Sequence, residues 1–275
     1  MLHTHRSEMV GNKNGEDMRV VVIGSGNVAE SLAQAIAEAE GLELVQVFAR
    51  NEARGCKVAE LAHTEWSNTS LAEADLYLIS VSDNAVEECA KKLHIPQNAV
   101  VAHTAGCCPM ESLAPHAHRA VFYPFQTFSI GRKVDFSRGY IFVEGATDHA
   151  LQVVEEVAYA LTPKVLPADT ARRAVIHLSG VFACNFANAM YANANEILAQ
   201  EGLPFDIVAP VIEETAKKAV EVQNPTATQT GPARRGDTQT LDRHRAMLAD
   251  QPSKRDIYDK ISEDICERAK ISKSF

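Results

Sequence analysis

Hydrophobic and polar positions follow two different patterns along the chain. From Met18 to Gly145, short apolar runs rich in β-branched residues alternate with stretches of helical period, which predicts strands and helices in turn. We expect strands at 18–23, 42–48, 74–81, 99–102, 120–128 and 140–144. Such alternation is typical of an α/β fold with a doubly wound parallel sheet of the Rossmann type.

After Gly145 the strands give way to helices, so we predict a Rossmann domain at 18–145 and an all-helical domain at 146–275. The segment 163–167 reads as a break between helices. The longest helix is expected at 170–200, and its middle is apolar on nearly every face. This pattern predicts a buried central helix, or a helix covered by a second subunit. Residues 1–17 are polar, lack the apolar core of an export signal, and are predicted to be disordered.

The first predicted strand ends in a glycine-rich turn, Gly24-Ser25-Gly26-Asn27-Val28-Ala29. Two glycines allow a tight turn and a close approach of backbone N–H groups to an anion, and Ala29 takes the third small position of the dinucleotide fingerprint. The helix that follows offers unpaired N–H groups to a pyrophosphate. A glycine turn occurs in many α/β proteins, but here a strand precedes it and a helix follows. The predicted cofactor-binding residues are therefore Gly24, Ser25, Gly26, Asn27 and Val28.

The second strand indicates which dinucleotide is bound. NAD sites usually place Asp or Glu after this strand, whereas an Arg there accommodates the 2′-phosphate of NADP. This chain has Arg50 and Asn51 at that point, and a guanidinium can hold a phosphate through two hydrogen bonds. The alternative for Arg50 is a solvated loop charge. Val81, Ser82 and Asp83 lie at the carboxyl end of another predicted strand, where open parallel sheets bind ligands, and we predict that they border the nicotinamide ribose. The alternative is a helix cap, because Asn84 and Glu87 have capping-box spacing. We therefore predict NADP as the cofactor.

Candidate proton donors lie in both halves of the chain. His177 lies on the long helix with Asn185 two turns further, and His103 ends a predicted sheet strand. A histidine that titrates near neutral pH can protonate a carbonyl that receives hydride. The alternative for both His177 and His103 is a structural role, in which the histidine lies in the core and makes one hydrogen bond. The three predicted catalytic residues are His177, Asn185 and His103.

The segment 224–237 mixes turn formers, hydroxyls and two arginines within an apolar half of the chain. It predicts a loop that grips an acidic group of the substrate, or else an exposed loop in which Asp237 or Thr238 caps the next helix. The predicted substrate-binding residues are Thr230, Gly231, Arg234, Arg235 and Asp237.

Composition narrows the class of partner. The net charge of −9 argues against a nucleic acid or an anionic membrane, and no apolar run is long enough for a bilayer span. Six scattered cysteines without a C-x-x-C pair fit free thiols in a reducing cytoplasm. No Cys, His and Asp cluster has metal-ligand spacing, so we predict no metal. A small-molecule substrate is the expected partner.

The glycine loop, residues 23–32, resembles the cofactor loops of pyrroline-5-carboxylate reductases and of coenzyme-F420-dependent NADP oxidoreductases. The whole chain is more similar to a family of Rossmann-like NADP oxidoreductases whose helical C-terminal domain has no assigned function. Four stretches carry this resemblance: the glycine loop, 81–84, 103–106 with 123–128, and 230–237.

The resemblance implies a helical domain like that of 6-phosphogluconate dehydrogenases, an active-site cleft between the domains, and a homodimer through the helices. Hydroxyacid dehydrogenases of this architecture carry a Lys-x-x-x-Asn pair, but this chain has Val181 before Asn185. Tyr123 also stands where such families have the histidine of a His-Pro pair.

Two hypotheses for the function follow. The chain is an NADP-dependent oxidoreductase of a small carbonyl, hydroxyl or imine compound, or it is an NADP-binding sensor without turnover.

Overall fold

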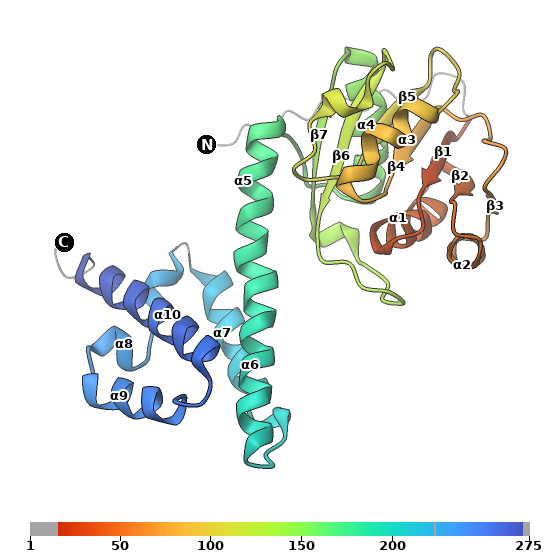
Figure 1. Ribbon diagram of the computed structural model, residues 1–275. Helices are drawn as coiled ribbons and strands as arrows, with labels where there is room; N and C mark the ends of the chain where they lie inside the picture. The colour runs from red at the N-terminus through yellow and green to blue at the C-terminus, as the bar shows by residue number, and fades with distance from the viewer. Residues whose placement is uncertain (1–15, 223, 272–275) are drawn as a thin grey trace. The chain divides into compact units, whose positions relative to one another are not determined.

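The computed structural model describes residues 16–222 and 224–271 and divides the chain into two compact units, Met1–Cys184 and Asn185–Phe275 (Figure 1). The predicted disordered tail lies largely outside the described residues. The predicted domain boundary after Gly145 stays a prediction. Each unit is described separately below.

The first unit is built on one eight-stranded sheet with the order β3-β2-β1-β4-β5-β6-β7-β8. All pairs from β3 to β6 are parallel, which confirms the predicted Rossmann sheet. Strand β7 runs antiparallel to β6 and pairs in parallel with β8. The strands are β1 Met18–Ile23, β2 Leu42–Phe48, β3 Glu65–Ser67, β4 Leu76–Ile79, β5 Val100–His103, β6 Arg119–Phe125, β7 Tyr140–Gly145 and β8 Val165–Pro167.

Strand β8 corrects the sequence prediction, which took 163–167 as a break between helices. It has only three residues and ends at Pro167, so it shows no alternation that a pattern could reveal. Its backbone pairs with Ile141, Phe142 and Val143 of β7. The sheet is therefore two strands wider than a six-stranded Rossmann sheet.

Helices cover both faces of this sheet (Figure 1). Alternate residues of β1 separate the two layers: Val20 and Val22 pack into one core cluster, and Val21 and Ile23 into the other. The first face is covered by α1 Asn27–Glu38, α2 Glu52–Leu61 and α4 Asp148–Leu161, and the second by α3 Val86–Lys92 and the start of α5 Thr170–Gly180. The cofactor loop therefore lies between a strand buried on both faces and a well-packed helix.

The long helical run predicted at 170–200 is present, but it is not one regular α-helix. Helix α5 continues into a π-helical segment, Val181–Phe186, and then into α6 Ala187–Gln200. The two units divide within the π segment. The predicted burial of its middle is wrong for the single chain, because Leu178 is 57% exposed and Phe182 is 65% exposed. An apolar pattern shows which side chains tend to be buried but not which part of the protein buries them. Burial of these side chains by a second subunit stays a prediction, and measuring the molecular mass of the protein in solution tests it.

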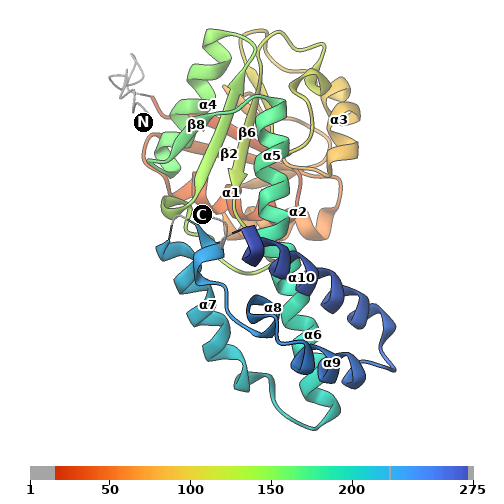
Figure 2. The same cartoon turned by 90° about the vertical axis from the view of Figure 1, so that its left-hand side faces the viewer.

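The second unit consists of helices and short turns (Figure 2). Ion pairs and polar contacts join its helices, including Arg245 Nε to Asp259 Oδ1 at 2.7 Å and Lys254 Nζ to Glu196 Oε2 at 2.7 Å. None of the described helices is both long and apolar enough to cross a membrane. Besides α6, the helices are α7 Ala209–Glu221, α8 Pro232–Arg235, α9 Thr238–Met247 and α10 Pro252–Ile271.

Candidate functional site

The glycine loop joins β1 to α1 in the geometry that the sequence predicts. Gly24 has a φ of +130°, and a Cβ built on it would lie 2.2 Å from the Ser80 carbonyl oxygen of the neighbouring chain segment. Gly26 forms the N-cap of α1 without a capping side chain, and a Cβ there would meet no atom within 4 Å. The first turn of α1 therefore presents uncapped N–H groups next to open space, which fits the pyrophosphate of a dinucleotide.

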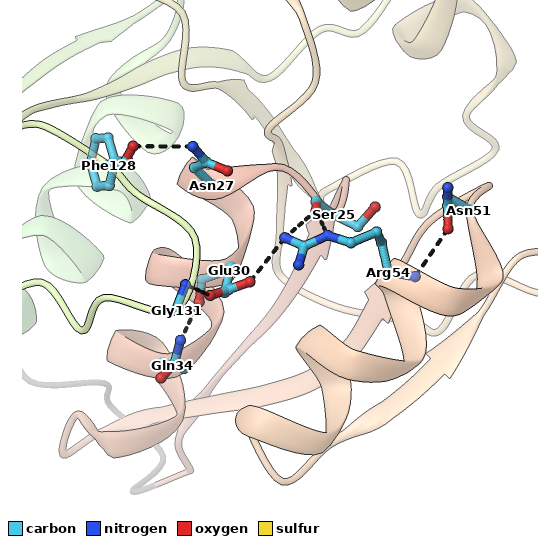
Figure 3. Close-up of polar contacts among 8 residues, drawn as sticks. All are labelled: Ser25, Asn27, Glu30, Gln34, Asn51, Arg54, Phe128 and Gly131. Carbon is cyan, nitrogen blue, oxygen red and sulfur yellow. Dashed lines mark hydrogen bonds and ion pairs between the residues drawn. The ribbon is translucent and has the colours of Figure 1, made fainter.

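A buried carboxylate in that first turn organises the loop (Figure 3). Glu30 accepts a hydrogen bond from Arg54 Nη2 at 2.9 Å and another from the Gly131 N–H at 2.9 Å. Arg54 also donates to the Ser25 carbonyl through Nε at 3.3 Å and Nη2 at 3.2 Å. The ion pair therefore ties α2 to the glycine loop. The sequence analysis missed both side chains, because a Glu and an Arg 24 residues apart show no signal of pairing.

The Asn27 side chain also makes a contact outside the glycine loop. Its side-chain Nδ2 donates to the Phe128 carbonyl at 3.1 Å (Figure 3). Together with the bond from Gly131 to Glu30, this contact fastens the segment after β6 to the first turn of α1. The Asn27 side chain is therefore held within the protein by one of its amide hydrogens, and the backbone N–H of Asn27 faces no capping side chain.

The two residues predicted to bind the 2′-phosphate lie in different environments. The Asn51 side chain caps α2 by accepting from the Arg54 N–H at 3.0 Å (Figure 3). Arg50 is exposed and makes no hydrogen bond or ion pair with a described residue. Its guanidinium lies near α3: burial raises the pKa of the Cys89 thiol, and the Arg50 charge opposes that rise. Arg50 is thus the available cation at the end of β2.

Polar groups gather where β4 and β5 end. The Ser80 and Thr104 hydroxyls lie 3.1 Å apart and join the two strand ends. Ser82 and Asp83 are exposed just beyond β4, and Val81 is half-buried. These positions lie at the carboxyl ends of parallel strands, where open α/β sheets bind ligands.

His103 ends β5 as predicted, but its ring is fully buried. Its Nδ1 accepts a hydrogen bond from the Ala105 N–H at 3.2 Å. Burial lowers the pKa of His103 to about 4, and the positive charge of Arg173 adds to this effect. The ring is therefore neutral at pH 7. This environment favours a structural histidine over the predicted proton donor.

His177 is exposed rather than buried, and it pairs with a tyrosine that the sequence analysis did not assign. The Tyr123 hydroxyl lies 3.2 Å from His177 Nδ1. Tyr123 is only 8% exposed, and burial raises the pKa of its phenol to about 12, with Cys107 and Asp83 contributing further. The phenol therefore stays protonated at neutral pH and can donate to His177 Nδ1.

Gly106 packs directly against this pair. A Cβ built on Gly106 would lie 2.9 Å from His177 Nδ1 and 2.9 Å from Tyr123 Cζ. The segment after β5 therefore supports the Tyr123–His177 pair from one side. No local pattern links residues that are 54 positions apart, so only the packing of α5 against the sheet brings them together.

Arg173 lies one helical turn before His177 and is fully buried. Its guanidinium forms an ion pair with Glu144 of β7 and donates to the Ala168 carbonyl at 2.8 Å. It also donates to the Cys108 carbonyl at 3.1 Å, in the segment that follows β5. Arg173 therefore fixes the start of α5 against both the sheet and the segment beside Tyr123.

The remaining predicted residues lie in the second unit. Asn185 is exposed within the π segment. Asp237 caps α9 by accepting from the Thr240 N–H at 3.1 Å, as the alternative interpretation held. Thr230 and Arg235 are exposed, and Gly231 has a φ of +101°. Arg234 is half-buried and lines a cavity. Their roles in substrate binding stay predictions.

Comparisons with known proteins agree on both parts of the chain. Residues 19–106 match the family model "NADP oxidoreductase coenzyme F420-dependent", and residues 139–265 match "Domain of unknown function (DUF2520)". A crystal structure of a Bacteroides fragilis protein, assigned as an NADP oxidoreductase, is 38% identical with a TM-score of 0.86. The match covers 91% of this chain and 98% of the other.

More distant structures share the fold. A reductive aminase from Aspergillus terreus, in complex with NADPH and ethyl levulinate, is 15% identical with a TM-score of 0.68, and the match covers 93% of this chain and 94% of that one. A 1-pyrroline-5-carboxylate reductase from Streptococcus pyogenes is 13% identical with a TM-score of 0.59, over 91% and 99% of the two chains. The comparison with curated proteins finds no match.

Proposed function

Because the chain belongs to the family of NADP oxidoreductases that includes the Bacteroides fragilis protein, we propose that it binds NADP and transfers hydride to or from a small carbonyl, hydroxyl or imine compound. The observation that carries this proposal is the uncapped first turn of α1 beside Gly26, together with the exposed Arg50, which forms no ion pair with a described residue, at the end of β2. The backbone N–H groups beside the glycines can bind the pyrophosphate of a dinucleotide, and the guanidinium can bind its 2′-phosphate.

Arg50→Ala is expected to weaken NADPH binding about 10- to 100-fold and to leave NADH binding almost unchanged. A charge-assisted hydrogen bond to phosphate contributes about 1.5–3 kcal/mol, and NADH has no phosphate at this position. Calorimetric titration of the purified protein with each nucleotide measures the effect. Lys57→Ala removes a nearby exposed cation and serves as the matched control. Equal losses for NADPH and NADH would contradict the 2′-phosphate assignment.

The chemistry of the site follows from the Tyr123–His177 pair. Bound NADPH supplies the hydride for reduction. We assign Tyr123 as the donor of the proton that the oxygen or nitrogen of the substrate needs, because its phenol stays protonated at neutral pH. His177 Nδ1 lies within hydrogen-bond reach of the phenol oxygen. In the tautomer with hydrogen on Nδ1, His177 donates to that oxygen and replaces the proton that the phenol gives to the substrate, while the exposed ring takes up a proton from water in return. Hydride and proton together convert a carbonyl to an alcohol, or an imine to an amine.

Tyr123→Phe is expected to lower turnover by about 10²- to 10⁴-fold, the usual contribution of a positioned acid, with NADPH affinity unchanged. NADPH consumption with a panel of 2-oxo acids, aldehydes and imines supplies the assay. Tyr140→Phe removes a hydroxyl from a half-exposed ring on β7 and is the matched control. Full turnover in Tyr123→Phe would exclude the phenol as the acid.

The sensor hypothesis is the second candidate, and Val181 favours it, because related dehydrogenases have a lysine acid at this place. The same panel of 2-oxo acids, aldehydes and imines distinguishes the enzyme hypothesis from the sensor hypothesis. Tight NADPH binding without consumption of NADPH by any member of the panel would favour a sensor, whereas steady consumption with one member establishes an enzyme. Absence of binding for both nucleotides would remove both candidates.

A further inference from the structure

The second unit contains a cavity of its own, with a volume of ≈ 290 Å³. It lies between the turn at 225–229, helix α8 and the C-terminal part of α10. Its apolar walls include Ile261 and Ile265 of α10. Its polar groups come from Thr226, Gln229 and Arg234, and from the Asp264–Arg268 pair. A lining that combines apolar side chains with a few polar groups is typical of a small-molecule site.

Helix α8 holds Arg234 in a defined position at this cavity. The helix is a single turn between Gly231, with φ +101°, and Gly236, with φ +72°. Ala233 is buried, and its carbonyl accepts a hydrogen bond from the Cys266 thiol of α10 at 3.1 Å. Because its neighbour is fastened to α10, the Arg234 backbone has little freedom to move away from the cavity.

The Arg234 guanidinium makes no hydrogen bond or ion pair within the described part of the chain, although the side chain is half-buried. Arg268 on the same cavity pairs with Asp264 at 2.8 Å. Among the described residues that line the cavity, the charges of Asp264 and Arg268 offset one another, and Arg234 adds one positive charge. A partly buried guanidinium without an anion is costly, so a ligand that supplies one anion stabilises it.

The shape and charge of the cavity select one ligand class. A guanidinium matches the two oxygens of a carboxylate with two parallel hydrogen bonds. The Thr226 hydroxyl makes no hydrogen bond with a described residue and can add a third. The wall formed by Ile261 and Ile265 favours a short hydrocarbon chain over a further polar group. We propose that this cavity binds a small monocarboxylate with an apolar body, with its carboxylate on Arg234. The site needs no NADP and is independent of the function proposed above.

The test compares two adjacent arginines in the full-length protein. Isovalerate serves as the probe, and isovaleramide has the same shape without the charge. Ligand-observed NMR titration measures both affinities in the wild type, Arg234→Met, Arg234→Lys and Arg235→Met. Arg235 is exposed and absent from the cavity wall, so Arg235→Met is the matched control. Thermal unfolding and NADPH titration of each variant establish that the fold and the cofactor site are intact.

We expect isovalerate to bind the wild type at least about 10-fold more tightly than isovaleramide, since the amide lacks the charge-assisted pair. Arg234→Met removes that preference, Arg234→Lys retains part of it, and Arg235→Met retains all of it. The proposal is overturned if isovalerate does not bind the wild type, if acid and amide bind equally, or if both Met variants lose binding to the same extent. Tighter binding of inorganic phosphate than of isovalerate also overturns it.

Discussion

Gly24→Ala is expected to abolish NADPH binding and to lower the free energy of unfolding by about 3 kcal/mol. The new methyl group would lie 2.2 Å from the Ser80 carbonyl oxygen and 2.9 Å from its carbon, so β1 and the end of β4 must separate. The φ of +130° adds strain, because such backbone conformations cost an L-residue about 1–3 kcal/mol. Denaturant unfolding and calorimetric titration measure the two effects.

Gly26→Ala is the matched control for this substitution. Gly26 has a φ of −78°, and a Cβ there meets no atom within 4 Å, so we expect stability to change by less than about 1 kcal/mol. NADPH binding should still weaken, because the methyl group enters the open space beside the first turn of α1. If both variants lost the same stability, the contact between Gly24 and Ser80 would not be the cause.

Arg173→Met is expected to lower the free energy of unfolding by about 3–5 kcal/mol, the usual cost of removing one partner of a buried ion pair. The substitution leaves the Glu144 carboxylate and the Ala168 and Cys108 carbonyls without their donor. Glu144 is 23% exposed and can reach water, so the lower end of the range applies. Urea unfolding measures the loss.

Two further variants separate the ion pair from a general effect of the substitution. Arg172→Met removes an exposed neighbour on the same helix turn and should change stability by less than about 0.5 kcal/mol. Adding Glu144→Gln to Arg173→Met should recover part of the loss, because the unpaired carboxylate is then removed. No recovery would show that the backbone contacts of Arg173, rather than the ion pair, stabilise the fold.

The predictions that the structure confirms rest on short-range signals. The turn at Gly24 and Gly26 and the strands of the parallel sheet depend on residues that are only a few positions apart, and a local pattern in the sequence records them. The role of Asp237 as a helix cap could be predicted for the same reason, because the N–H that it accepts from is only three residues away. The strand β8 was missed because three residues are too few to show a period.

The arrangement of the candidate site depends on contacts that no local pattern records. The packing of α5 against the sheet places Tyr123 beside His177, α2 places Arg54 on Glu30, and the fold buries Arg173 against Glu144. Two adjacent arginines in the sequence, 172 and 173, look alike, yet one is exposed and the other fully buried.

The sequence by itself therefore determined the Rossmann sheet, the dinucleotide loop and the candidate cation Arg50, because backbone freedom and hydrophobic period are local properties. The tertiary structure alone decided which polar side chains are engaged and which are free. The Asn27 side chain is bonded to the distant Phe128 carbonyl, while Arg50 makes no hydrogen bond or ion pair with a described residue. Whether a polar side chain is available to a ligand depends on partners that folding brings from as far as 101 residues away, and on the burial that sets the cost of leaving a charge unpaired.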